Sequence, residues 1–282
     1  MRLKISHTTD YRYDEPVSYS LQRLRLTPLT QPGQSVIAWE TSVEGAKVEV
    51  GYEDHFGNRI TLVSVNGEQD HIRIVAQGEV ETADRAGVFG PHQSYVPLWL
   101  FLRETPLTKR AKAIRDLAKS QTGDGDLARM HALMGAIHAA VTYLPGETGA
   151  ETTAEEALLR GNGVCQDHTH IMIAAARALD LPARYVSGYL MLNDTVEQTA
   201  SHAWAEVHLA GLGWVGFDAA NNVCPDDRYV RIATGLDYRD AAPVSGLVHG
   251  AARETLTVGL TVEQTQSQSQ SQQGQEQSQS QA

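Results

Sequence analysis

The chain is poor in cysteine, in long apolar runs and in basic residues relative to acidic ones. Its two cysteines, Cys165 and Cys224, exclude a disulfide framework and favour a protein kept reduced in the cytoplasm. No stretch approaches the roughly 20 apolar residues that a membrane span needs. Residues 1–7 also lack the apolar core of a secretory signal peptide. We therefore expect a cytoplasmic protein without a membrane partner.

The shortage of basic residues limits the partners further. Against 23 Lys and Arg stand 34 Asp and Glu, so the formal net charge is −11 at pH 7. Phosphate backbones and anionic membrane surfaces repel such a chain, and nucleic acid is therefore not expected as a partner. Hydrophobic residues make up 41% of the sequence, which suffices for one large or two modest cores. The oligomeric state is not specified by any of these features.

Short β-strand patterns fill the first third of the chain. Apolar residues such as Leu3 and Ile5 alternate with polar ones, and turn signals separate the patterns, most clearly at residues 54–58. Short strands with frequent turns are typical of a small β-sandwich. We predict an N-terminal β-sandwich-like domain over residues 1–98, which ends in an irregular linker containing Gly and Pro.

Helical patterns follow the linker and give way to further strands. Pro106 suits the first turn of a helix, and residues 153–156 form a capping box before another. Strand patterns at residues 230–233 and 256–260 are expected to close an antiparallel sheet. Residues 99–262 are therefore predicted to form a core of helices plus antiparallel sheet, which makes the fold class α+β.

One junction in this core combines features of a nucleophilic site. A glycine-containing turn at residues 161–163 runs into a helical pattern at 166–179 that lacks Gly and Pro. Cys165 stands in the first helical turn, where free backbone N–H groups and the helix dipole favour the nucleophilic thiolate. A lone cysteine is commonly a buried structural residue instead, which is the alternative for Cys165. Cys224 has no comparable setting, and we expect it to be incidental. Asp167 is expected to cap the free N–H groups.

A predicted hairpin downstream supplies a base and an orienting acid. His202 begins its first strand and Asp218 ends its second, with a turn at residues 211–213 between them. Antiparallel pairing places the start of one strand beside the end of the next, so these two side chains should be neighbours. A cysteine at a helix start together with such a pair is the arrangement of a papain-like thiol enzyme.

Three motifs together resemble the transglutaminase-like superfamily, in the bacterial branch that is often labelled as cysteine proteases. They are G-V-C-Q-D at 163–167, H-A-W-A-E-V at 202–207 and G-W-V-G-F-D at 213–218. The family's Asp-Pro-Thr-Asn reads Asp-Ala-Ala-Asn at residues 218–221, which leaves the shape of that loop open. The first part of the chain resembles the N-terminal domain that accompanies this core in bacteria, at residues 7–13, 16–17, 24–28 and 54–58.

The resemblance implies a papain-like or transglutaminase-like core that acts on peptide or protein amides. Cys165 would attack the carbonyl, His202 would move the proton, Asp218 would hold the imidazole, and a thioacyl-enzyme would form. Water would then give a cysteine protease or amidase, and an amine would give a transglutaminase. We expect hydrolysis, because bacterial members are mostly described as hydrolase-like. No cofactor is implied, and a non-catalytic module that binds peptide through its β domain is the alternative from another class.

Other side chains are weaker candidates. Tyr143 is a candidate oxyanion donor on the resemblance alone. Trp204 and Trp214 lie on the two hairpin strands, where they either wall a substrate groove or pack in the core. His168 and His170 face different sides of one helix, so no metal site is predicted.

The end of the chain differs sharply in composition from the rest. Residues 263–282 are almost entirely Gln and Ser, and we predict a disordered tail because such a segment cannot bury apolar surface. A glutamine-rich tail on a relative of transglutaminases suggests a substrate, but a solvated tail is the simpler interpretation.

Overall fold

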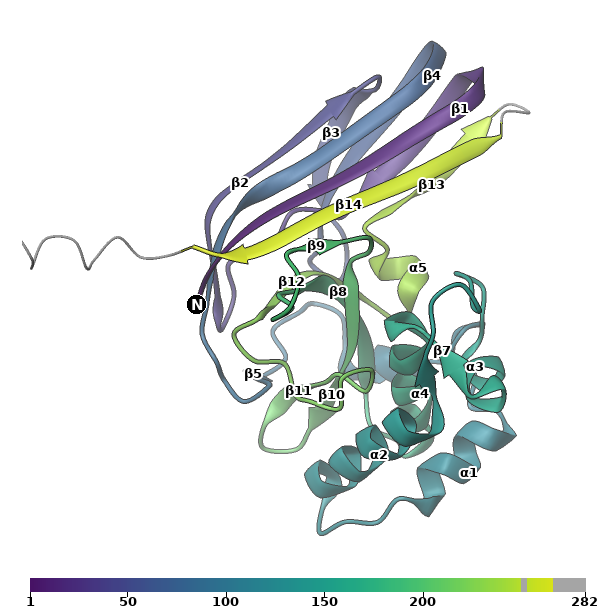
Figure 1. Ribbon diagram of the computed structural model, residues 1–282. Coiled ribbons are helices and arrows are strands. Elements are labelled where there is room, and N and C mark those ends of the chain that lie inside the picture. The colour runs from purple at the N-terminus through teal and green to yellow at the C-terminus, as the bar shows by residue number, and fades with distance from the viewer. Residues whose placement is uncertain (250–252, 266–282) are drawn as a thin grey trace, which may run out of the picture.

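The structure is a computed structural model that describes residues 1–249 and 253–265 (Figure 1). It contains two larger antiparallel sheets, one of seven strands and one of five. In Figure 1 the seven-stranded sheet forms the upper body, and the five-stranded sheet lies below it beside the helices. The architecture is mixed α+β with a β-rich first part, as the sequence predicts.

The seven-stranded sheet is built on two long strands, β1 (Arg2–Leu24) and β4 (Arg59–Thr82), which pair along most of their length. Register shifts on either side of Val17 interrupt the pairing and let the strands bend. Apolar side chains from both strands, including Val17 and Ile74, form a core within this domain. The other strands of this sheet are β2 (Gln34–Glu44), β3 (Lys47–Glu53), β9 (Glu197–Gln198), β13 (Val244–His249) and β14 (Glu254–Gln264).

The five-stranded sheet carries the hairpin predicted from the sequence. Its order is β12-β8-β10-β11-β5, with β5 (Val88–Gly90), β8 (Ala183–Leu190), β10 (His202–Leu209), β11 (Gly213–Phe217) and β12 (Tyr229–Gly235). Alternate residues of β10 and β11, such as Ala205 and Val215, share one hydrophobic core with Ile173 of helix α4 (Cys165–Ala178). The helix therefore covers one face of the sheet.

The remaining helices surround α4 and its start. The two-residue strands β6 (Thr142–Tyr143) and β7 (Asn162–Gly163) pair in parallel directly before α4 and fix the path of the chain into it. The other helices are the 3-10 helix η1 (Leu98–Leu102), α1 (Lys112–Ser120), α2 (Asp126–Ala140), α3 (Ala154–Arg160) and α5 (Tyr238–Ala241). Among the described residues, no helix is both long and apolar enough to cross a membrane.

The last strands correct one sequence prediction. Residues 230–233 lie in β12 and close the five-stranded sheet as expected, but residues 256–260 belong to β14, which pairs with β1. The physical reason is burial, because Leu260 and Val262 pack against Leu3 and Ile5 of β1 in a cluster that lies between the two sheets and also contains Tyr189 of β8. The β domain thus includes strands that come from the far end of the sequence.

Two further predictions need correction. Residues 263 and 264, assigned to the tail, belong to β14, where Glu263 forms an ion pair with Lys4. The rest of the predicted tail, from residue 266, lies outside the described residues. Pro106 precedes helix α1 instead of opening it, because the helix begins at Lys112.

Candidate active site

Cys165 is the first residue of α4 and lies at the end of a tightly constrained turn. Gly161 has a φ of 71°, in the left-handed region that favours glycine, and ends α3. Gly163 packs against Asp167 so closely that an added Cβ would lie 2.7 Å from a carboxylate oxygen. Cys165 as a whole residue is only 9% exposed. The glycine turn therefore presents the cysteine at the helix start, as the sequence predicts.

Asp167 holds this turn in place. Its buried carboxylate accepts hydrogen bonds through Oδ2 from the backbone N–H of Val164, at 2.8 Å, and from the hydroxyl of Thr148, at 2.7 Å. The first bond ties the residue before the helix to the third helical residue, which is the capping role expected for Asp167. The second attaches the loop after β6 to the same point.

The hairpin brings His202 and Asp218 together. Strands β10 and β11 pair from Ala205 opposite Phe217 to Leu209 opposite Gly213. The start of one strand thus lies beside the end of the other, and His202 Nε2 donates to Asp218 Oδ2 at 2.7 Å. Because Nε2 faces the carboxylate, Nδ1 is the ring nitrogen available to Cys165.

Electrostatics favour a charged imidazole at this place. Burial lowers the pKa of His202, but the charge of Asp218 and the hydrogen bond between them, together with interactions with Cys165, raise it to about 10. Burial raises the pKa of Asp218, but the charge of His202 and the hydrogen bonds from His202, Asn221 and Tyr229 outweigh that effect. The pKa of Asp218 therefore lies below its usual range. The arrangement can therefore hold an imidazolium paired with the Asp218 carboxylate at neutral pH.

Two partners of Asp218 were not identified from the sequence. Asn221 Nδ2 and the hydroxyl of Tyr229 each donate to Asp218 Oδ2 at 2.7 Å. Asn221 belongs to the Asp-Ala-Ala-Asn segment, so its position after Asp218 was a usable signal. Tyr229 comes from β12, which follows the hairpin in sequence but is separated from it in the sheet by β8, and no local pattern marks it.

Tyr143 lies beside the thiol, where the resemblance suggested it. It belongs to β6 and is paired with Gly163, two residues before Cys165. Burial raises the pKa of Tyr143 to about 12, with a further contribution from the charge of Cys165 and a hydrogen bond to it. Its side chain remains 52% exposed and lines a cavity of about 480 Å³ together with His202 and Asn221.

The two tryptophans do not line this cavity. Trp204 is buried beneath the histidine, with its ring centroid 6.4 Å from that of His202 and nearly parallel to it. Trp214 is also buried and lies on a different cavity, with the guanidinium of Arg184 4.0 Å above its ring. The sequence left two roles open for these tryptophans, lining a substrate groove or packing in the core. Their burial fits core packing for both residues.

The histidines that follow Cys165 have structural partners. His170 accepts a hydrogen bond from the backbone N–H of Tyr238 through Nε2, and His168 lies between the carbonyl oxygens of Val164 and Val141. Within residues 1–249 and 253–265, no group of three or more His, Cys, Asp or Glu side chains could hold a metal ion.

Taken together, a helix that opens with cysteine and packs on an antiparallel sheet bearing a His–Asp pair defines the papain-like class of fold. Residues 3–81 match the bacterial transglutaminase-like N-terminal region, and residues 112–219 match the transglutaminase-like superfamily. The chain therefore contains a transglutaminase-like core and carries the bacterial N-terminal region in front of it.

Individual relatives agree with this assignment. A crystal structure of a "putative cysteine protease" from Cytophaga hutchinsonii superimposes with a TM-score of 0.75 at 25% identity, covering 95% of this chain and 92% of that one. An uncharacterized protein of Mycobacterium leprae is 28% identical over 91% of this chain and 96% of its own length. A protein-glutamine gamma-glutamyltransferase of Pseudomonas aeruginosa is 32% identical over 123 residues, which are 38% of this chain and 18% of that protein.

Proposed function

We propose that the protein is a thiol-dependent enzyme that hydrolyses amide or peptide bonds through Cys165, His202 and Asp218. The observation that carries the proposal is the 2.7 Å bond between His202 Nε2 and the buried Asp218, next to a cysteine at the start of α4. A nucleophile, a base and an orienting acid in this order are the requirements for covalent acyl transfer.

The reaction follows from the ion pair. The Cys165 thiolate attacks the carbonyl carbon, and the tetrahedral intermediate collapses to a thioester while the His202 imidazolium gives its proton to the departing amine. Water then enters, His202 takes its proton, and the hydroxide attacks the thioester to release the acid and the thiolate. Asp218 stabilises the imidazolium and prevents the ring from rotating.

The oxyanion of the tetrahedral intermediate needs hydrogen-bond donors close to the Cys165 thiol. The backbone N–H of Cys165 is one candidate, and the hydroxyl of Tyr143 is the side-chain candidate because it lies beside Cys165. We predict that Tyr143→Phe lowers kcat by about 10²- to 10³-fold with little change in KM. Steady-state kinetics on a substrate that the wild type cleaves would measure this, and an unchanged kcat would assign the donor to another group.

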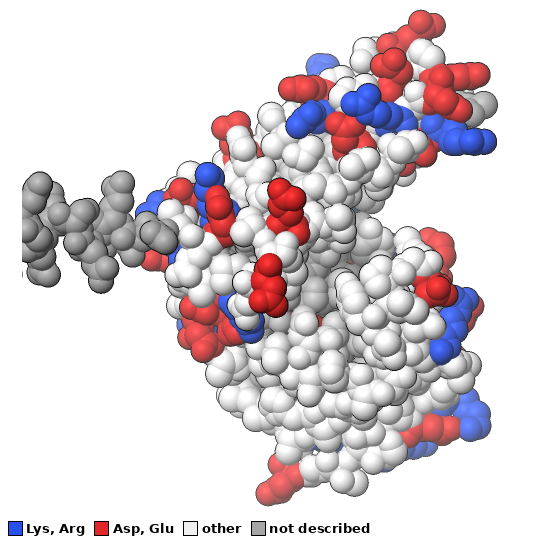
Figure 2. Space-filling model, viewed as in Figure 1, with Lys and Arg blue, Asp and Glu red and all other residues white. Residues whose placement is uncertain are grey.

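Acyl transfer to an amine is the second candidate function. The local similarity to a protein-glutamine gamma-glutamyltransferase favours it, while the similarity over nearly the whole length to a protein described as a cysteine protease favours hydrolysis. Figure 2 shows that the middle and lower part of the viewed face, over α2 and the β10–β11 hairpin, carries few charges. Mass spectrometry of the products from a glutamine-containing peptide, with and without a primary amine, distinguishes the two reactions.

The nucleophile is tested by Cys165→Ala. Alanine is a good helix residue, so we expect the fold to persist and the activity to disappear. Cys224→Ala is the matched control and should retain full activity. Circular dichroism and an assay on the same amide measure both effects, and residual activity of Cys165→Ala near the wild-type rate would refute the mechanism.

Thiol labelling separates the enzyme from a non-catalytic peptide-binding module. Cys224 serves as an internal reference, because burial raises its pKa to about 11. If Cys165 and His202 form an ion pair, iodoacetamide should modify Cys165 well below pH 7 while Cys224 stays unmodified. Equal and slow labelling of both cysteines would favour the binding module.

The cytoplasmic location remains a prediction that two unpaired thiols support.

A further inference from the structure

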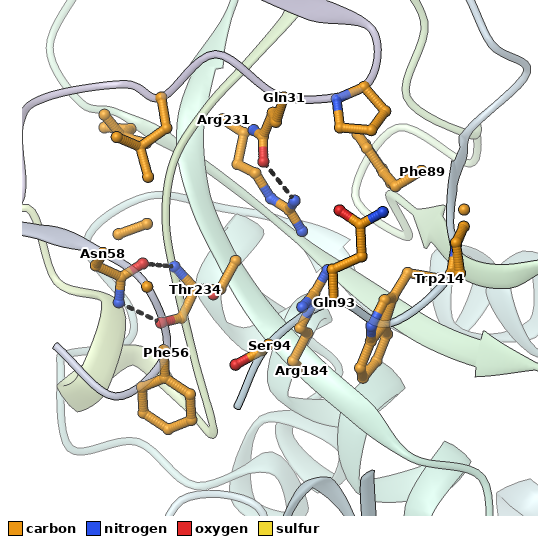
Figure 3. A pocket seen from close by; sticks show the side chains of 17 residues that line it. Gln31, Phe56, Asn58, Phe89, Gln93, Ser94, Arg184, Trp214, Arg231 and Thr234 are labelled. Carbon is orange, nitrogen blue, oxygen red and sulfur yellow. Dashed lines mark hydrogen bonds between the residues drawn. The ribbon is translucent and has the colours of Figure 1, made fainter. Parts of the chain in front are cut away.

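A second cavity lies away from the triad, between the β domain and the five-stranded sheet. Its volume is about 160 Å³. Residues from two loops of the β domain, between β1 and β2 and between β3 and β4, line one side. Side chains from β8, β11 and β12 line the other (Figure 3). Cavities of about 150 Å³ can take up a molecule the size of benzene, so this one has room for a small ligand.

The charges in this cavity do not balance. Glu206 of β10 is fully buried and binds Arg184 at 2.7 Å between Nε and Oε2, and it also binds Arg231 Nη2 through the same oxygen. Among the described residues, the only charged side chains that line the cavity are these two arginines. One carboxylate therefore compensates two guanidinium groups, which leaves a surplus of one positive charge beside a cavity that is partly open to solvent.

Aromatic rings and an amide hold both guanidinium groups in place. Arg184 stacks on Trp214, and Arg231 lies 4.8 Å from the ring centre of Phe89. Arg231 also donates through Nη1 to Gln31 Oε1 at 3.0 Å, as Figure 3 shows. Preorganised guanidinium groups lose little conformational freedom when an anion binds.

Both arginines keep N–H donors that have no hydrogen-bond partner among the described residues. Arg231 Nε is buried and has no hydrogen-bond partner among the described residues. Arg184 donates only through Nε within the described part of the chain, so its two terminal nitrogens remain free. Burial lowers the pKa of Arg231 to about 10 despite the attraction of Glu206, as expected for an incompletely compensated cation. Gln93 and Ser94 add neutral polar groups at the rim.

We propose that this cavity is a binding site for a small oxyanion, a carboxylate or a phosphate group, held by Arg184 and Arg231. Guanidinium groups match the planar geometry of carboxylates and the oxygens of phosphate. The site joins the β domain to the catalytic sheet, since Gln31 and Arg231 come from opposite sides of it. Binding there stabilises the junction of the two bodies.

The site is separate from the proposed triad. Glu206 and His202 lie four residues apart on β10, about 13 Å along the strand, and Trp204 fills the space between them. The proposal therefore does not depend on hydrolysis, and its test needs no substrate.

The test uses the full chain and three probes: inorganic phosphate, acetate and succinate, each titrated against chloride at constant ionic strength. Thermal unfolding and isothermal calorimetry should show saturable binding and a rise in Tm for phosphate, for the carboxylates or for both, and the comparison identifies the preferred group. A Tm that does not change as the probes replace chloride, with no saturable heat of binding, would overturn the proposal.

Two variants locate the site. Arg184→Gln removes the surplus charge, keeps the pair of Glu206 and Arg231, and should weaken binding at least tenfold. Gln93→Glu changes an exposed rim residue and adds a tethered carboxylate, so it should raise Tm without added anion and abolish the effect of the probes, even if Arg184→Gln fails to fold. Arg115→Gln, on the surface of α1, is the control. Equal anion effects in Gln93→Glu and wild type would refute the assignment.

Discussion

At the scale of single residues, Asp218 determines the charge state of the candidate site. Both of its oxygens accept hydrogen bonds: Oδ2 from His202, Asn221 and Tyr229, and Oδ1 from the backbone of Ala220 and Asn221. A carboxylate with this many donors stays ionised and cannot rotate away from the imidazole. The raised pKa of His202 is a consequence of this network.

Asp218→Asn tests whether this network sets the charge of His202. We expect kcat to fall about 10²-fold, less than the roughly 10⁴-fold seen in Ser–His–Asp enzymes, because a thiolate–imidazolium pair is already charge-separated. Without the carboxylate the pKa of His202 falls from about 10. The alkaline limb of the kcat/KM profile should therefore move to lower pH. An exposed aspartate, Asp116, provides the control Asp116→Asn, which should leave rate and profile unchanged.

The same change should alter how stability depends on pH. The folded-state pKa of His202 lies above its ordinary value of 6.5, so its charge stabilises the fold fully below pH 6.5 and progressively less as pH rises toward 10. Urea unfolding across this window should show the decline in wild type and a flatter curve in Asp218→Asn. Equal slopes in both proteins would mean that Asp218 does not set the charge of His202.

At the scale of elements, the start of α4 is held from outside the helix. Asp167 caps Val164 and also accepts from Thr148, which lies in the loop after β6. The helix start, the glycine turn and that loop are thus joined at one buried carboxylate. Tyr143 lies just before the same loop, so the position of the candidate oxyanion donor depends on this connection.

Thr148→Val tests the connection. Valine has nearly the same shape but cannot donate, and Asp167 would lose one of its two donors. Hydrogen bonds to charged groups contribute about 1.5–3 kcal/mol, so the free energy of unfolding should fall by about that amount. Thr152→Val, which removes an exposed turn hydroxyl that accepts from Gly149, is the control and should cost less than about 1 kcal/mol. Similar losses in both variants, measured in urea, would contradict the role assigned to Thr148.

The helix start and the hairpin could be predicted because their signals are local. The glycine turn, Cys165 and the helical run are consecutive, and a short hairpin places His202 beside Asp218 by geometry alone. The direction of Trp204 and Trp214 could not be predicted, because both faces of their sheet are buried and hydrophobicity does not distinguish the faces. The same holds for Tyr229, which reaches Asp218 from a strand at the other edge of the hairpin's sheet.

At the scale of the whole molecule, the β domain is completed by distant sequence. Strand β14 pairs with β1 from Leu3 opposite Gln264 to Tyr13 opposite Glu254. Leu260 and Val262 share a buried cluster with Leu3, and this cluster also contains Tyr189 and Val230 of the five-stranded sheet. Sequence patterns identified the strand but not its sheet, since its partner lies some 250 residues earlier and pairing at that distance leaves no local signal.

A fragment of residues 1–98 tests this arrangement. It contains the whole N-terminal domain predicted from sequence but lacks β14, so one edge of β1 and the apolar cluster at Leu3 are exposed. We expect no cooperative thermal unfolding by circular dichroism. A fusion of residues 1–98 to residues 253–265 through a flexible Gly/Ser linker should restore cooperative unfolding. If the bare fragment melts as sharply and at the same Tm as the fusion, β14 is dispensable.

The pairing of β9 with β14 also sets an order of events during synthesis. β9 lies in the loop that walls the candidate active-site cavity, and its partners on β14 are Leu260 and Thr261. Cys165, His202 and Asp218 all leave the ribosome before that strand does. A nascent chain can therefore hold all three reacting side chains while one wall of its cavity has no support. The cavity takes its final shape only after β14 has been translated, so neighbouring nascent chains meet an incomplete binding surface until then.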